Sequence, residues 1–487
     1  MTALRRALIF ALCLVPIVCA VAADGPRERP LAITNVNIVD VTDGSIWRNS
    51  TIYIRGNRIQ WVAKHAFLEH GERLKVVNGG ERYVIPGLWN MHVHLVQDLP
   101  AEYTEHVLMP LMIANGVSGV RDMGGNLTRL KSLRDRIASG ALLGPRIMFS
   151  GPMIDGPQPA YSDSLAVTTE DDARAAVRLL KQQGADFIKV QSLLPRAPYF
   201  AVADEAKKQG LMFVGHVPDA VTAAEGSEAG QRTMEHMLTI LRGCSTEERQ
   251  IMAADEEFGL RTGLTPAQRN AFGQAQRERI LRTFSPARAD DLFQRLLSNR
   301  NWQTPTLVQL RFFEQADTNE WERDPRMRFV PAFLRDKWKR QRDDFLKGRS
   351  AANLASWKAF FRKNRELLGP MRRDYVHFLA GTDNGPYAFP GSDLLDELQL
   401  LVENGLSPLT ALRGATIEAA IAVNRQREYG AIAQGRIADI VFLDGNPLED
   451  IRNVRKISAV VYNGHFYDQR DLDRMTQDAA KAAAEVK

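Results

Sequence analysis

The chain has 487 residues, of which 45% are hydrophobic and 25% are charged, and its formal net charge is +5. At about 150 residues per domain, this length fits two or three domains, or one large α/β barrel with a companion domain. The composition excludes a disordered or collagen-like chain. No run of Lys and Arg resembles a nucleic-acid footprint, so nucleic acid is not an expected partner.

The first residues have the pattern of a secretory signal peptide. Arg5 and Arg6 precede an apolar stretch over residues 7–18, and an Ala-x-Ala pattern follows at residues 20–22. We therefore predict that residues 1–23 are a signal peptide and that the mature protein is secreted or periplasmic. An uncleaved membrane anchor is the alternative, which the shortness of the apolar run disfavours. No other segment reaches the roughly 20 apolar residues of a membrane span, so we expect no membrane contact after cleavage.

Cysteine usage limits how the mature chain can be stabilised. Two of the three cysteines lie in the predicted signal peptide, which leaves Cys244. A single cysteine cannot form an internal disulfide, so the exported protein must depend on its core or on metal. We expect Cys244 to be an inert buried thiol.

Both ends of the mature chain have the pattern of short β-strands. Residues 31–84 contain alternating apolar and polar runs joined by Gly and Asn. The same pattern occurs in residues 439–447 and 457–467. We predict one small β-sandwich domain built from both termini, with residues 24–84 as its first part and residues 427–487 as its second part and a tail.

The middle of the chain, residues 85–426, alternates apolar strands with helical patterns such as those over residues 170–183 and 199–209. Eight such strands predict a (β/α)8 TIM barrel, whose active site lies at the C-terminal ends of the strands, and an open doubly wound sheet is the alternative. The predicted strands are Ile85–His94, Gly119–Met123, Arg146–Ser150, Asp186–Gln191, Met212–His216, Thr233–His236, Thr304–Val308 and Phe378–Asp383.

One stretch interrupts this alternation. Residues 245–375 are long, charged and rich in helical pattern. We expect a set of surface helices, with a basic binding patch as the alternative. A role as a lid or in substrate recognition is also open, because barrel loops carry recognition.

Histidines and one aspartate mark the ends of several predicted strands. His92 and His94 are two residues apart, so they face the same side of a strand and can share one metal ion. His216, His236 and Asp383 each close another predicted strand. A single histidine at a strand end is usually structural, but four histidines and an acid at one end of a barrel favour a metal site.

Lys189 lies within an apolar strand, where an unpaired ammonium group is costly to bury. It could reach the barrel rim or pair with an acid. A metal site offers another solution, because a deprotonated lysine reacts with CO2 to form an anionic carbamate that can bridge two cations.

The motifs around these residues resemble those of the amidohydrolase superfamily, and within it the imidazolonepropionase/prolidase-like branch of metal-dependent peptidases. The resemblance covers nearly the whole mature chain. The matching segments are PGLWNMHVHL, GVSGVRDMGG, GADFIKV, VGHVPDA, MEHM, AGTD and GRIADIVFLDGNP.

The resemblance implies two divalent metal ions, with Zn2+ as the default for such ligands. It assigns His92, His94 and Asp383 to the more buried ion, His216 and His236 to the more exposed one, and a carboxylated Lys189 to the bridge between them. A hydroxide shared by the ions would attack the scissile carbonyl, while Asp383 would take up a proton and later give it to the leaving amine.

The predicted protein is thus a secreted dinuclear amidohydrolase that cleaves an amide or peptide bond of a small substrate, such as a dipeptide or an N-acyl amino acid. The alternatives are a lactone or organophosphate ester hydrolase with the same metal pair, and a non-catalytic barrel that binds a ligand. Arg121, Tyr161 and Tyr387 lie near strand ends and are candidates for substrate binding. The sequence is also compatible with a homo-oligomer.

Overall fold

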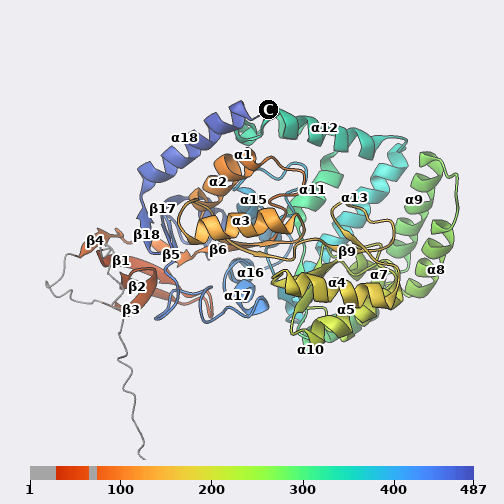
Figure 1. Ribbon diagram of the computed structural model, residues 1–487, viewed down its shortest axis with the longest axis horizontal. Coiled ribbons are helices and arrows are strands. Elements are labelled where there is room, and N and C mark those ends of the chain that lie inside the picture. The colour runs from red at the N-terminus through yellow and green to blue at the C-terminus, as the bar shows by residue number, and fades with distance from the viewer. Residues whose placement is uncertain (1–28, 65–73, 487) are drawn as a thin grey trace, which may run out of the picture.

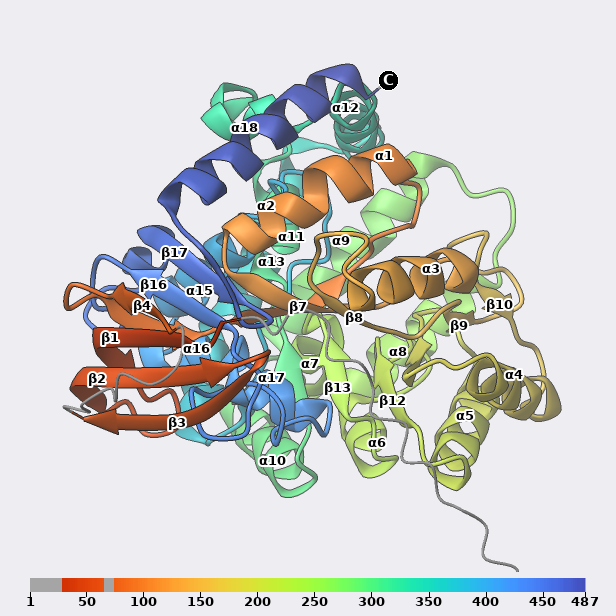
Figure 2. The same ribbon diagram turned by 60° about the vertical axis from the view of Figure 1, so that its left-hand side comes forward.

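The computed structural model describes residues 29–64 and 74–486. The predicted signal peptide lies outside these residues. Figures 1 and 2 show a barrel with helices around it, a sheet on one side that holds both the first and the last strands, and a group of helices on the other side. Within the described ranges, no helix is both long and apolar enough to cross a membrane.

Eight parallel strands form the barrel. They are β6 (Leu88–Val93), β7 (Val117–Asp122), β8 (Arg146–Phe149), β11 (Phe187–Val190), β12 (Met212–Gly215), β13 (Thr233–Glu235), β14 (Trp302–Thr304) and β15 (His377–Phe378). Backbone hydrogen bonds close the ring at two places: Asp186 N donates to Phe149 O (2.9 Å), and Met91 N donates to Ala380 O (2.9 Å). The predicted (β/α)8 barrel is therefore confirmed, and the open sheet is excluded.

Helices that alternate with these strands cover the outside of the barrel. They are α1 (Ala101–Tyr103), the π-helix η1 (Thr104–Leu108), α2 (Met109–Ala114), α3 (Leu127–Ala138), α4 (Glu170–Gln182), α5 (Arg196–Lys208), α6 (Ala223–Glu228), α7 (Leu238–Gly243), α11 (Leu307–Gln315), α15 (Asp393–Glu403), α16 (Pro408–Gly414) and α17 (Ile417–Ala422). Helix α4 illustrates why they form: Thr169 and Asp172 make a capping box, and Ala173, Val177 and Leu180 are buried at helical spacing. Two short strands, β9 (Ile154–Asp155) and β10 (Leu165–Ala166), lie in the connection after β8.

The predicted interruption over residues 245–375 is helical, but it consists of two separate insertions. The first lies between β13 and β14, and the second lies between α11 and β15. The first comprises α8 (Glu248–Gly259), α9 (Pro266–Arg282) and α10 (Pro286–Ser298). The second comprises the 3-10 helices η2 (Glu320–Arg323) and η3 (Pro325–Phe329), then α12 (Ala332–Leu346), α13 (Ala351–Glu366) and α14 (Leu368–Arg373). Strand β14 and helix α11 therefore return to the barrel between the two.

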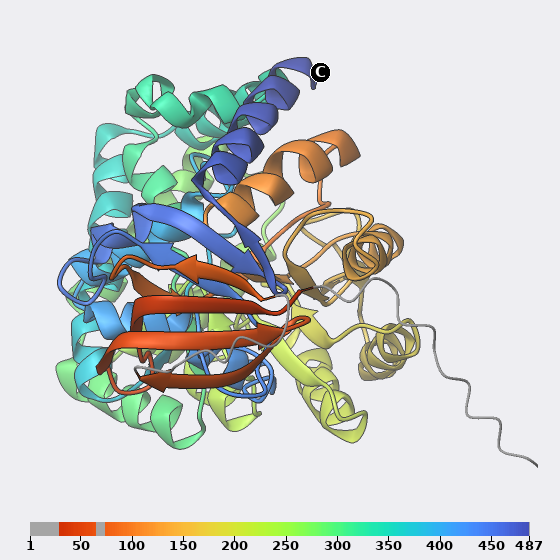
Figure 3. The same cartoon turned by 90° about the vertical axis from the view of Figure 1, so that its left-hand side faces the viewer.

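Strands from both ends of the chain form one sheet, as predicted for the small β-domain. Its members are β1 (Leu31–Val39), β2 (Ile46–Arg55), β3 (Arg58–Lys64), β4 (Lys75–Asn78), β5 (Tyr83–Pro86), β16 (Ile440–Leu443), β17 (Ile457–Tyr462) and β18 (His465–Tyr467). Their order is β18-β17-β16-β5-β1-β2-β3, with β4 paired to β1, so the contact between β5 and β16 joins the two ends (Figure 3). The 3-10 helix η4 (Ile451–Arg455) connects β16 to β17, and helix α18 (Gln469–Glu485) packs on α2 and η1.

The predicted strand Ile85–His94 is wrong as a single element, because the chain breaks at Gly87 into β5 and β6. Gly87 N donates to Asp439 O (2.9 Å), and a Cβ at position 87 would lie 2.4 Å from the Ser118 hydroxyl. This close approach lets one continuous segment pass from the small sheet into the barrel.

The predicted strand Thr304–Val308 is also wrong in its limits, since β14 ends at Thr304. Pro305 has no N–H for a sheet, and Thr306 adopts a left-handed conformation (φ 50°), after which α11 begins. Likewise, β15 ends at Phe378, although the following residues stay hydrogen-bonded to β6.

Candidate metal centre

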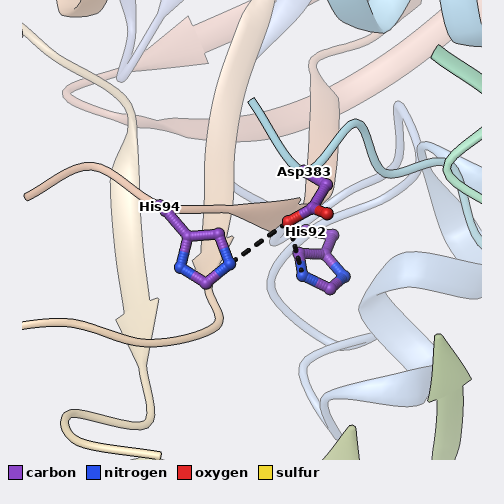
Figure 4. Close-up of side chains that lie close together, drawn as sticks. All are labelled: His92, His94 and Asp383. Carbon is purple, nitrogen blue, oxygen red and sulfur yellow. Dashed lines mark ion pairs between the residues drawn. The ribbon is translucent and has the colours of Figure 1, made fainter. Parts of the chain in front are cut away.

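His92, His94 and Asp383 converge at the C-terminal end of the barrel. His92 is in β6, His94 follows it, and Asp383 lies in the loop after β15. Both Nε2 atoms lie 3.2 Å from Asp383 Oδ1 (Figure 4). One donor atom from each residue falls within 4.8 Å of the other two, and in the described part of the chain no other group of His, Cys, Asp and Glu side chains does so. The three residues can therefore bind one metal ion.

His236 and His216 continue this cluster. His236 Nε2 lies 3.9 Å from Asp383 Oδ2. The ring centroids of His92 and His236 are 4.9 Å apart, and those of His236 and His216 are 4.7 Å apart. The four predicted histidine ligands thus lie side by side, although His216 and His236 are outside the tight group of three.

Every one of these histidines has its Nδ1 atom engaged. The partners are Glu235 Oε2 for His92 (2.9 Å), Gly124 O for His94 (3.0 Å), Ser192 Oγ for His216 (2.6 Å) and Thr306 Oγ1 for His236 (2.6 Å). Such contacts fix the orientation of a ring and leave Nε2 for a metal ion. The side chains therefore have the arrangement of metal ligands.

Lys189 lies in β11 and is 1% exposed. Among the described residues its Nζ atom has no hydrogen-bond partner. Lys189 pairs in the sheet with Val214, two residues before His216, and burial lowers the pKa of Lys189 to about 8. Buried polar atoms are normally hydrogen-bonded, so an unpaired amine at this site fits a group that binds there.

Burial also favours the neutral histidines that metal binding requires. It lowers the pKa of His236 to about 3 and that of His216 well below its ordinary value. Burial would raise the pKa of Asp383, but the neighbouring histidines outweigh it and hold that pKa well below its usual range. Neutral imidazole is thus favoured at His216 and His236, whereas the contact with Asp383 outweighs burial at His94 and raises its pKa.

Sequence reasoning missed Glu235. Its carboxylate is fully buried, accepts a hydrogen bond from Arg121 Nη2 (2.9 Å) and contacts His92 Nδ1. Burial would raise the pKa of Glu235, but the Arg121 guanidinium outweighs burial and lowers it. The one available signal was its position directly before His236, which is too weak to separate it from other acidic residues.

A cavity of about 150 Å³ lies next to His94 and Asp383. Its other lining residues are Gln97, Asp98, Leu99, Tyr161, Gln309, Leu334, Lys337, Trp338, Gln341, Asn384, Gly385 and Pro386. Leu334, Lys337, Trp338 and Gln341 belong to α12, so the second insertion forms part of the wall.

The three candidates for substrate binding occupy different places. Tyr161 is 43% exposed and lines the cavity. Arg121 is 1% exposed and donates hydrogen bonds to Met91 O and Thr233 Oγ1 as well as to Glu235. Tyr387 is buried and stacks on Trp321. Neither Arg121 nor Tyr387 is among the lining residues.

The barrel and its cluster of histidines and Asp383 define a metal-dependent hydrolase. Comparison with known proteins gives the family: the Amidohydrolase family model matches residues 83–466, and the chain belongs to this family. The predicted superfamily and the predicted enzyme class, a metal-dependent hydrolase of C–N bonds, are thereby confirmed.

Individual relatives are distant but match along most of their length. Ochratoxinase of Aspergillus niger is 22% identical over 506 aligned residues, which cover 90% of this chain and 88% of the relative. Among solved structures, a putative prolidase from Bifidobacterium longum has a TM-score of 0.65 at 23% identity, covering 93% of this chain and 100% of that one. A Xaa-Pro dipeptidase with bound methionine in the active site has a TM-score of 0.64 at 20% identity, covering 90% of this chain and 100% of that one. These structures share the fold.

Proposed function

We propose that the protein is a dinuclear amidohydrolase that cleaves an amide or peptide bond in a small substrate, such as a dipeptide or an N-acyl amino acid. The observation that carries this proposal is the set of four histidines whose Nδ1 atoms are all engaged, gathered around Asp383 beside a buried, unpaired Lys189.

His92, His94 and Asp383 would bind one divalent ion, and His216 and His236 would bind the second. A carboxylated Lys189 would supply the anionic bridge, which accounts for an amine buried without a partner. Imidazole and carboxylate ligands suit Zn2+. When bound, such ions lower the pKa of water and polarise a carbonyl oxygen.

Asp383 is the residue placed to move protons. Its carboxylate lies between the histidines and the cavity, so it can accept a proton from an attacking water molecule and donate it to the amine that leaves. Glu235 and Thr306 hold the rings of His92 and His236 in place.

The relatives support this reaction class. One solved structure is described as a Xaa-Pro dipeptidase and another as a putative prolidase, and both have this fold. The matched family model covers the whole barrel of this chain.

A substrate screen of the metal-loaded protein tests the proposal. We expect hydrolysis of some members of a library of dipeptides and N-acyl amino acids, and loss of this activity in Asp383→Asn with the fold retained by circular dichroism. Activity on lactones or organophosphate esters alone would contradict the amidase assignment. Loss of metal content in Asp383→Asn, measured on the same samples, would show a ligand role as well.

We further propose that the protein is exported and that residues 1–23 are removed. Arginines before an apolar run and an Ala-x-Ala pattern support this proposal. Intact-mass measurement of material recovered outside the cytoplasm should give a chain that begins after Ala22 or Ala23. A mass that includes Met1 or Arg5 would contradict cleavage.

A further inference from the structure

The wall of the cavity beside Asp383 carries one basic side chain, Lys337, apart from the metal-site histidine His94. Lys337 comes from α12 in the second insertion, and its side chain is 30% exposed. Its Nζ atom lies 3.5 Å from Asp98 Oδ2, and both residues line the cavity, so the amine lies at the cavity wall. A positive charge at this place can select a substrate by charge.

Within residues 29–64 and 74–486, Asp98 is the one ion-pair partner of Lys337, at 3.5 Å between Nζ and Oδ2. The Asp98 side chain is 73% exposed, so its carboxylate stays largely hydrated and the pair is weak. An ammonium group has three N–H donors, and Asp98 uses one of them. Lys337 can therefore bind a further anion without losing this contact.

Other hydrogen-bond donors line the same cavity. Gln341 lies one helical turn after Lys337 on α12, and Tyr161 lies in the β9–β10 connection.

We propose that Lys337 is a specificity-determining residue that binds a free carboxylate of the substrate, with Gln341 and Tyr161 as additional donors. This inference rests on the proposed function. It predicts that the enzyme favours dipeptides or N-acyl amino acids with an unblocked carboxyl group over the same compounds with a terminal carboxamide. A charge-assisted hydrogen bond is stronger than a neutral one, which gives the free acid its advantage.

The test compares an N-acyl amino acid with its carboxamide in the wild type, Lys337→Met and Asp98→Asn. Lys337→Met should raise KM for the free acid by about tenfold or more and leave KM for the carboxamide and kcat nearly unchanged. Asp98→Asn removes a competing carboxylate and should lower KM for the free acid a few-fold. Lys339→Met is the matched control, because Lys339 lies on the same helix outside the cavity wall and should leave both KM values unchanged.

Calorimetric binding of an N-acetyl amino acid, with its carboxamide as comparison, separates this inference from the reaction. One outcome is that no substrate is hydrolysed, but the wild type binds the free acid more tightly than the carboxamide and Lys337→Met does not. That result would support the carboxylate site and contradict the proposed reaction. If the wild type hydrolyses amides but treats acid and carboxamide alike, or if Lys337→Met behaves as the wild type does, the inference is overturned. Tighter binding of a cationic ligand that is lost in Asp98→Asn would also overturn it.

Discussion

Glu235 links the metal centre to the interior of the barrel. One carboxylate oxygen contacts His92 Nδ1 and the other accepts from the buried guanidinium of Arg121. Removing its charge would leave Arg121 buried without a counter-charge and would loosen the orientation of His92. The residue therefore serves stability and metal binding together.

We predict that Glu235→Gln lowers metal affinity by about 10- to 100-fold, because the ring of His92 loses its anionic partner. The free energy of unfolding should fall by about 3 kcal/mol, since an uncompensated buried charge is costly. Metal titration and urea denaturation measure the two effects. Glu228→Gln is the control: Glu228 pairs with Arg295 at the surface, so the loss should stay below about 1 kcal/mol. Equal effects of the two substitutions would contradict the role of Glu235.

The sequence could indicate the residues that we propose as ligands, but not the residues that orient them. His92, His216, His236 and Asp383 follow or close apolar runs, and the parallel barrel brings such strand ends together. Ser192 and Thr306 are ordinary hydroxyl residues in loops, and their contacts with the rings depend on the tertiary structure. Similarly, nothing local shows that Lys337, in a distant insertion, faces the same cavity.

At the scale of elements, the junction between the small sheet and the barrel depends on Gly87. Strands β5 and β6 follow each other almost directly in the sequence, and the Pro86-Gly87 pair between them is the local sign of a break. The structure places Gly87 where Ser118 and Asp439 leave no room for a side chain. A close approach of this kind is a tertiary property, which explains why the predicted single strand was wrong.

Gly87→Ala should lower the free energy of unfolding by about 1–3 kcal/mol, because its Cβ would lie 2.4 Å from Ser118 Oγ and 2.7 Å from Asp439 Cβ. Gly259→Ala is the matched control, since nothing lies within 4 Å of a Cβ there. Thermal and chemical denaturation of both variants check this. Unchanged stability of Gly87→Ala would show that the junction can relax at little cost.

Helix α17 carries Glu418 at the end of the barrel opposite the metal centre. The carboxylate accepts from Trp302 Nε1 (2.8 Å) at the start of β14 and from Arg413 Nη2 (2.7 Å), and it lies 3.4 Å from His377 Nδ1 at the start of β15. Burial would raise the pKa of Glu418, but these three partners outweigh burial and lower it to about 2.

A carboxyl whose pKa is lowered by folding stabilises the protein above its unfolded pKa and loses this contribution as the pH falls towards its folded pKa. Glu418 should therefore contribute about 2–3 kcal/mol at neutral pH, which is lost between about pH 4.5 and pH 2. Glu418→Gln should have a lower free energy of unfolding at pH 7, and that free energy should depend less on pH between about pH 4.5 and pH 2. Denaturation at several pH values measures the free energy of unfolding. The same pH dependence in wild type and variant would contradict this role of Glu418.

At the scale of the whole molecule, the two ends of the chain complete one sheet. Strand β16 pairs with β5, and β17 and β18 extend the sheet beyond it. Buried residues from both ends, such as Ile33, Val84, Ile440 and Val461, share one core. The sequence could predict this shared sheet because both ends have the same alternating strand pattern.

A chain that ends at Asn424 should consequently fail to fold cooperatively. It lacks β16 to β18, so β5 loses its neighbour and the apolar face of the remaining strands is uncovered. Thermal melting and light scattering should show aggregation or a broad transition. A truncated chain that melts as sharply and at the same temperature as the full chain would contradict the shared sheet.

The measurement that tests the central claim most directly is the metal content of wild type and Lys189→Ala. Two neighbouring dications need an anionic bridge, and a carboxylated Lys189 is the proposed source. Elemental analysis of the purified proteins should give about two ions per wild-type chain and about one or fewer in the variant, with activity reduced by several orders of magnitude. Acetate or propionate should restore part of the metal content and part of the activity of Lys189→Ala, because the carboxylate can occupy the space left by the lysine side chain. Two bound ions and normal turnover in Lys189→Ala would contradict the bridging role of Lys189, and one ion or fewer per wild-type chain would contradict the dinuclear site.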